Sequence, residues 1–199
     1  MTVNAQMVKE LRQKTGAGIM DCKKALAEKN GDIEAAIQYL REKGIADAAR
    51  RAGRAASDGV IGSYVHAGGK IGVLVEVNCE TDFVARTDDF TELVKNLAMQ
   101  VCSENPVCVR REDVPAELLE EERQICASQA RQTGKPEKII EKIVAGKLES
   151  FYARTCLLEQ EFIRDRNMTV QDYVNSKIAK LGENIAVRRF VRFQLGEES

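Results

Sequence analysis

Residues 59–79 read GVIGSYVHAGGKIGVLVEVNC, and here the hydrophobic pattern changes from a helical period to the alternation of β-strands. Two strand-like runs, 60–66 and 70–78, flank the turn residues Ala67-Gly68-Gly69, which predicts a β-hairpin. A further strand is predicted at 185–195, where apolar residues alternate with arginines that would face solvent. Strands and helical patterns are segregated rather than alternating, so the sequence predicts an α+β fold with antiparallel strands.

The part of the chain before the hairpin predicts a compact bundle of three short helices, of the size of a UBA domain. Asn4 and Asp32 are suited to cap the first and third helices, because their side chains can accept bonds from free backbone amides. Gly44 is suited to follow the end of the third helix, because glycine tolerates positive φ. The helices are predicted at 4–14, 18–29 and 32–43, followed by a helical connector at 45–53.

The part after the hairpin is predicted to be mostly helical until the last strand. Thr87 or Asp88 caps the helix with the clearest amphipathic pattern, and Asn105-Pro106 ends it. The pattern of residues 157–163 does not clearly predict a helix or a strand. The remaining helices are predicted at 115–132, at 137–144 after a break at Gly134-Lys135-Pro136, at 147–153 as helix or turn, and at 169–181.

Charge divides the chain in the same place as the pattern does. The first 54 residues carry 11 Lys and Arg against 7 Asp and Glu, whereas the remaining residues carry 19 against 24. The net charge of −1 therefore combines a basic head with an acidic body, and it argues against direct binding of nucleic acid. We predict two domains, a helical head at 1–54 and an α+β core at 55–199.

Several classes of function are disfavoured by what the sequence lacks. No apolar run approaches the ~20 residues of a membrane helix, and the first residues do not resemble a secretory signal, so we expect a cytoplasmic protein. None of the Gly-Lys pairs has the spacing of a phosphate-binding loop, so no nucleotide site is expected in the chain itself. His66 is the single histidine and lies at the predicted hairpin turn, which favours a structural role. We therefore expect no catalytic residue, no metal site and no cofactor.

Cysteines and acidic clusters add little chemistry to this picture. The six cysteines contain no Cys-x-x-Cys pair, so we interpret them as reduced, mostly buried thiols rather than as zinc ligands or a redox pair. The acidic clusters Asp88-Asp89 and Glu120-Glu121-Glu122 lie in helical patterns, which favours solvated helix surfaces over metal or acid–base sites.

Residues 11–26 contain the first candidate for a binding site. A turn with two glycines places Ile19 and Met20 at the start of the second predicted helix, where Arg12, Lys23 and Lys24 would surround them. Two large apolar side chains with a basic rim would suit a docking patch. Equally, Met20 and Leu26 could fill the core of the small bundle, and the pattern leaves both possibilities open.

Residues 78–86 contain the second candidate, a polar turn between a strand and a helix with Phe83 at its tip. Such an aromatic side chain either folds back into the core or is presented to a partner. The pattern alone favours the core, because aromatic residues are mostly buried.

Three stretches together resemble the bacterial elongation factor Ts family. They are TGAGIMDCKKAL at 15–26, EVNCETDFVA at 76–85 and GENIAVRRF at 182–190, and the similarity extends over nearly the whole chain. The length of 199 residues resembles the short form of the family, which lacks the longer body and coiled-coil insertion of other members.

The resemblance implies a nucleotide exchange factor for the translational GTPase elongation factor Tu. It implies a UBA-like head that docks on the GTPase through Arg12, Ile19 and Met20, with Lys23 on the rim. The turn Thr81-Asp82-Phe83-Val84 would enter near the nucleotide site, with Phe83 as a wedge and Asp82 fixing the turn and contacting the partner. A homodimer forming a 2:2 complex is also implied, without covalent chemistry.

Two other functions remain as alternatives. The size of the head would also suit a ubiquitin-binding adaptor with the body as a scaffold. An enzyme with a cysteine nucleophile would have only His66 as a base.

Overall fold

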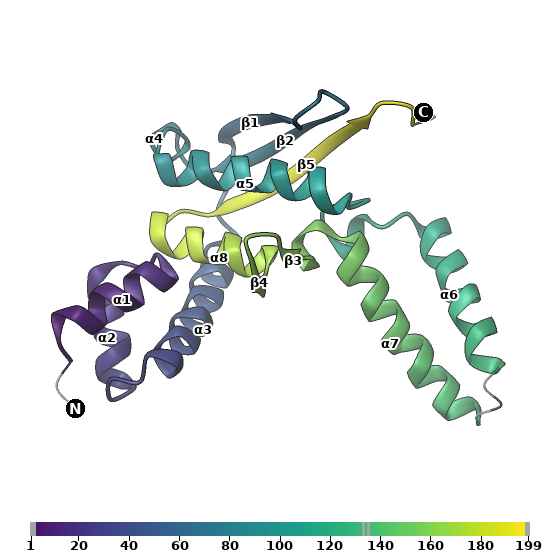
Figure 1. Ribbon diagram of the computed structural model, residues 1–199, viewed down its shortest axis with the longest axis horizontal. Helices are drawn as coiled ribbons and strands as arrows, with labels where there is room; N and C mark the ends of the chain where they lie inside the picture. Colours follow the sequence, from purple (N-terminus) through teal and green to yellow (C-terminus); the bar gives the residue numbers. More distant parts are fainter. Residues whose placement is uncertain (1–2, 133, 135, 198–199) are drawn as a thin grey trace. The chain divides into compact units, whose positions relative to one another are not determined.

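The computed structural model describes residues 3–132, 134 and 136–197 (Figure 1). The chain divides into two compact units, and each is assembled from three separate stretches. The first contains Met1–Gly62, Glu76–Asn96 and Gln171–Arg188, and the second contains Ser63–Val75, Leu97–Val170 and Arg189–Ser199. A helical run at the start is followed by an α+β part with antiparallel strands, which confirms the predicted fold class.

The first unit begins with the three predicted helices, α1 (Ala5–Thr15), α2 (Ile19–Glu28) and α3 (Ile33–Arg51). Asn4 caps α1 by accepting a 2.9 Å bond from the Met7 amide, and Asp32 caps α3 in the same way. Both caps were expected, because capping depends on neighbours within one turn. The side chains buried between the three helices are Leu11, Cys22, Ala25, Leu26 and Ala36.

The predicted end of the third helix at Gly44 is wrong, because α3 continues without a break to Arg51. The second half of α3 is held by contacts with α8 (Val170–Leu181). Arg41 pairs with Asp172, and the Arg51 side chain donates to the Gly182 carbonyl at 3.1 Å. These long-range contacts outweigh the weak local preference of glycine for a helix end.

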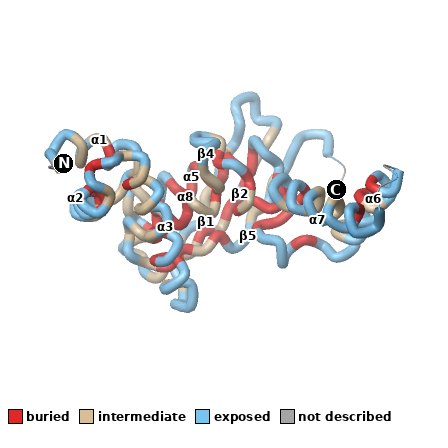
Figure 2. Tube along the Cα trace, turned by 90° about the horizontal axis from the view of Figure 1, so that it is seen from below, coloured by how far each residue is buried: buried red, intermediate tan, exposed pale blue. Residues whose placement is uncertain are grey.

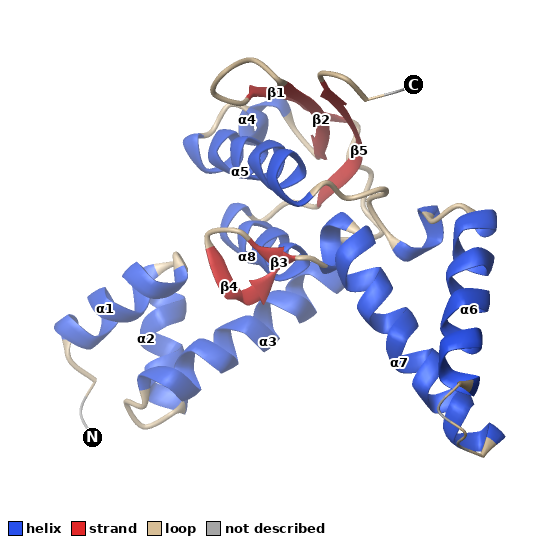
Figure 3. Cartoon of the chain, turned by 45° about the vertical axis from the view of Figure 1, so that its right-hand side comes forward, coloured by secondary structure: helices blue, strands red, loops and turns tan. Residues whose placement is uncertain are grey.

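The sheet has the strand order β1-β2-β5, formed by β1 (Asp58–Val65), β2 (Ile71–Cys79) and β5 (Ile185–Gln194). The hairpin between β1 and β2 is confirmed, with positive φ angles of 92° at Gly68 and 68° at Gly69. Its closing bond runs from the His66 amide to the Ile71 carbonyl at 2.9 Å. Buried residues follow β2 and the helix α5 (Asp88–Glu104) (Figure 2), and α5 runs along one face of the sheet (Figure 3).

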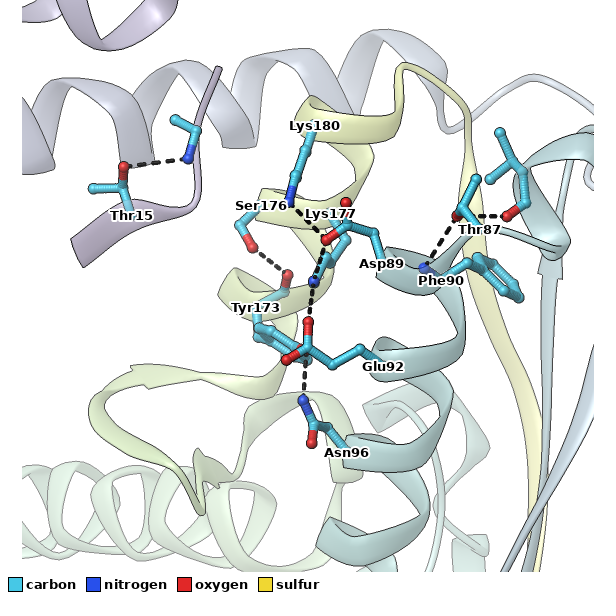
Figure 4. A network of polar contacts seen from close by, with 12 residues as sticks. Thr15, Thr87, Asp89, Phe90, Glu92, Asn96, Tyr173, Ser176, Lys177 and Lys180 are labelled. Atoms are coloured by element: carbon cyan, nitrogen blue, oxygen red, sulfur yellow. Dashed lines mark hydrogen bonds and ion pairs between the residues drawn. The ribbon is translucent and has the colours of Figure 1, made fainter. Parts of the chain in front are cut away.

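Within the first unit, an ion network joins the start of α5 to α8 (Figure 4). Lys177 is only 9% exposed, and its ammonium group lies 3.0 Å from Asp89 and 2.8 Å from Glu92. Lys180 also pairs with Asp89 at 2.6 Å. The hydrogen bonds from Lys180 and Lys177 lower the pKa of Asp89 below its ordinary value. Asp89, from the acidic cluster at 88–89, therefore forms a structural contact between two helices.

The second unit contains an antiparallel pair of helices, α6 (Ala116–Arg131) and α7 (Glu137–Thr155), which lie side by side (Figures 1 and 3). The sequence predicts two helical pieces here, 137–144 and 147–153. In the structure α7 is one continuous helix, because the backbone stays helical through Gly146. The predicted break at Gly134-Lys135-Pro136 falls between the two helices, although Lys135 lies outside the described residues.

The ambiguous residues 157–163 and those after them form short elements. These are a 3₁₀ turn at Leu157–Glu159 and a small antiparallel pair, β3 (Glu161–Phe162) and β4 (Asp165–Thr169). The structure adds a second 3₁₀ turn, at Arg111–Asp113, before α6. No helix in the described part of the chain is long and apolar enough to cross a membrane.

Candidate partner-binding site

The turn with Phe83 forms one short helix, α4 (Asp82–Ala85), directly after β2. Thr81 caps this helix: its hydroxyl accepts a 3.4 Å bond from the Val84 amide. Ala85 is buried, Val84 is half-buried, and Phe83 is 80% exposed. The expectation from pattern alone that Phe83 joins the core is therefore wrong, because Ala85 faces inward from α4 instead.

The ends of the turn are fixed from both sides by hydrogen bonds. The buried Cys79 thiol donates to the Thr81 carbonyl at 3.1 Å, and the Thr87 hydroxyl donates to the Val84 carbonyl at 2.8 Å. The Glu183 carboxylate accepts bonds from the Thr81 amide and hydroxyl at 3.1 and 2.7 Å. Sequence reasoning missed Glu183, whose only signal was its place in the stretch at 182–190.

Asp82 plays a smaller part in the turn than the resemblance suggested. Its carboxylate pairs with Arg86 at 2.8 Å, and both side chains are largely exposed, at 44% and 79%. Exposed pairs of this kind contribute about 0.5 kcal/mol. Thr81 and Glu183 supply the bonds that fix the backbone of the turn, and Asp82 remains accessible to a partner.

The second candidate surface lies at the start of α2. Ile19 is 55% exposed and Met20 is 74% exposed, whereas Leu26 is fully buried. Of the two possibilities left open by the sequence, Leu26 fills the small core and Met20 does not. Arg12 in the last turn of α1 and Lys23 in α2 are both exposed as well. We call Arg12, Ile19, Met20 and Lys23 the head surface.

The histidine and the cysteines are the residues that a nucleophilic mechanism would use. His66 is exposed at the hairpin turn, where its Nδ1 lies 3.2 Å from the Tyr64 hydroxyl. All six cysteines are buried free thiols. Burial raises the pKa of Cys79 to about 11 and that of Cys156 to about 12, so neither is a thiolate at neutral pH. The described residues contain no group of three or more His, Cys, Asp or Glu side chains able to hold a metal ion.

Comparison with known proteins gives a consistent result over nearly the full chain. Residues 2–197 match the family described as Elongation factor TS. The chain is 63% identical to Elongation factor Ts of Moorella thermoacetica over 195 residues, covering 98% of this chain and 96% of the relative. It is 60% identical to Elongation factor Ts of Geobacter sulfurreducens over 197 residues, covering 99% of this chain and 91% of the relative.

An exposed aromatic turn and an exposed apolar helix start are features typical of proteins that bind another protein. Among such proteins the matches identify a factor of translation elongation. The chain belongs to the elongation factor Ts family.

Proposed function

We propose that this protein binds elongation factor Tu in its GDP form and promotes release of GDP, so that GTP can be loaded. It does so by disturbing the Mg²⁺ and phosphate site of the GTPase, without covalent chemistry and without a cofactor or nucleotide site of its own. Family membership supports this proposal, and the observation that carries it is the 80% exposure of Phe83 on a turn whose backbone is firmly bonded. A cytoplasmic location follows from this role.

Such a surface can supply the binding free energy that nucleotide exchange requires. A protein that prefers the nucleotide-free form of its partner weakens GDP binding by the same factor, because the coupling between two ligands is reciprocal. A thousandfold weakening requires about 4 kcal/mol of differential binding. Truncation of a buried aromatic anchor in an interface typically costs about 2–4 kcal/mol, so Phe83 can supply a large share.

The head surface has the complementary role in this proposal. Ile19 and Met20 provide exposed apolar area, and Arg12 and Lys23 provide positive charge beside it. Binding through this surface holds the complex together equally in all nucleotide states, and the turn supplies the state-dependent part. We assign docking to residues 1–54, and exchange and dimerisation to residues 55–199.

We also propose that the protein forms a homodimer and a 2:2 complex with elongation factor Tu. Within the second unit, large apolar side chains are exposed on the three strands and just beyond the last. They are Val65 at 67%, Leu74 at 45%, Phe193 at 67% and Leu195 at 77%. Single exposed apolar residues are ordinary, but several on one small sheet suit contact with a second copy. Sedimentation equilibrium of the protein alone and with the GTPase measures both stoichiometries.

The experiment that tests the exchange function is a GDP-release assay. Elongation factor Tu is loaded with a fluorescent GDP and mixed with excess unlabelled GDP and a substoichiometric amount of this protein. We expect release to accelerate and one molecule of the protein to act on many GTPase molecules. Release at the uncatalysed rate across all concentrations would refute the proposal, and so would stoichiometric trapping without turnover.

A further inference from the structure

The most extensively bonded group near Phe83 is the carboxylate of Glu183, which comes from the segment between α8 and β5. Its Oε2 accepts from the Glu80 and Thr81 amides, both at 3.1 Å, and its Oε1 accepts from the Thr81 hydroxyl at 2.7 Å. One side chain therefore satisfies three donors at the point where β2 ends and α4 begins. Hydrogen bonds to an ionised carboxylate are about twice as strong as neutral ones.

The contact is reciprocal, which fixes the two segments against each other in more than one direction. The Glu80 carboxylate accepts a 2.6 Å bond from the amide of Asn184, the residue after Glu183. The buried Asn184 side chain in turn donates to the Arg54 carbonyl at 2.8 Å. Gly182 allows this approach, because its φ of 78° turns the chain sharply at the end of α8.

The turn needs such support, because it has little of its own. A helix of four residues is far below the ~12–15 residues at which isolated helices become stable. Its one buried side chain is the small Ala85, Val84 is half-buried, and Phe83 contributes almost no burial to the fold. The bonds to Glu183 therefore account for much of the order in the backbone that presents Phe83.

We infer that Glu183 is a positioning residue for exchange, which holds the Phe83 turn in the conformation that enters the GTPase. The inference rests on the proposed function. Holding the turn in advance matters because an interface that must first be ordered loses part of its binding free energy to that ordering. Loss of the Glu183 bonds should therefore weaken the action of the turn while the head surface still docks.

The experiment compares Glu183→Ala and Glu183→Gln with wild type and with Glu121→Gln, an exposed control on α6. GDP release is measured over a range of protein concentrations, which separates the maximal rate from the half-saturating concentration. We expect Glu183→Ala to lower the maximal rate about tenfold, equivalent to ~1.4 kcal/mol, with a much smaller change in half-saturation. Glu183→Gln keeps one acceptor oxygen and the same shape, so it should recover part of the rate. Glu121→Gln should match wild type.

Hydrogen–deuterium exchange provides a readout that does not require the GTPase. In Glu183→Ala the amides of Glu80 and Thr81 should exchange faster, while those within α1 and α2 remain as protected as in wild type. Glu183→Gln, which preserves the packing, tests the same point if the alanine variant is poorly folded.

The possible results separate this inference from the proposed function. If wild type does not accelerate GDP release, the proposed function fails and this inference fails with it. If wild type is active and both Glu183 variants keep its maximal rate, only the positioning role is overturned. A change confined to the half-saturating concentration would also overturn it, because that result would assign Glu183 to docking.

Discussion

Truncation of Phe83 to alanine should nearly abolish exchange without weakening the fold. A Phe side chain offers about 200 Å² for burial, and Phe83 is 80% exposed, which leaves about 160 Å² free to be covered by a partner. At ~25 cal/mol per Å² this area corresponds to ~4 kcal/mol of binding. If half of it appears only in the nucleotide-free complex, Phe83→Ala lowers the exchange rate roughly 30-fold.

Because Phe83 is exposed, we expect Phe83→Ala to leave the free energy of unfolding nearly unchanged. Surface substitutions away from packed or bonded groups shift the free energy of unfolding by about 0.5 kcal/mol or less. Two measurements are therefore made on the same preparation. Stopped-flow release of fluorescent GDP gives the exchange rate, and urea unfolding gives the stability. Val107→Ala, 56% exposed and far along the chain from either surface, is the matched control.

Two results would refute this reasoning. Normal exchange by a folded Phe83→Ala variant would show that Phe83 is not the wedge. A loss of unfolding free energy of several kcal/mol would show that the side chain is buried in solution, in contrast to its exposure in the structure. An intermediate rate with unchanged stability would measure the share of the work that falls to the rest of the turn.

Four further predictions concern the fold. Gly44→Ala should raise the free energy of unfolding by about 1 kcal/mol in a urea titration, because the position is helical and alanine favours the helix more than glycine does. The site has room for the change, since the nearest backbone atom would lie 3.8 Å from the added Cβ. Lys177→Met should lower it by about 1–2 kcal/mol, because two carboxylates lose their buried partner. The pKa of Asp89 is lower in the folded protein than in the unfolded chain. Its contribution to the free energy of unfolding is therefore complete above the unfolded pKa and is lost as pH falls through the folded pKa. In Asp89→Asn, the free energy of unfolding should fall less steeply with decreasing pH below about pH 4. The thiols of Cys79 and Cys156 should resist alkylation at pH 8 in the native protein and react quickly in urea, since burial raises the pKa of each.

Local signals in the sequence predicted the parts of the fold that local chemistry controls. Asn4 and Asp32 cap helices, and Gly68 turns the hairpin, because each acts on residues within one turn of the chain. The continuation of α3 through Gly44 could not be predicted in this way, because the contacts that hold it come from α8, more than a hundred residues away. Glycine lowers helix propensity wherever it stands, and only packing decides whether the helix ends there.

The candidate site shows the same division. The sequence pointed to the turn at 81–84 and to the start of α2, because unusual residue types gather there. It left the burial of Met20 open and wrongly favoured burial of Phe83, since the same pattern fits an inward or an outward side chain. Glu183 could not be predicted for another reason: two of its three bonds come from backbone amides, which do not depend on residue type, and the third comes from Thr81, 102 positions away.

The bond between Thr81 and Glu183 joins residues 102 positions apart, which has a consequence for the order of events during synthesis. The Phe83 turn leaves the ribosome long before the carboxylate that holds it, so in the growing chain only the Thr81 cap and its near neighbours can shape the turn. Closing so long a loop is slow, and contacts of high sequence separation form late in folding. The nascent protein should therefore acquire its head first and its exchange activity last, when β5 joins the sheet.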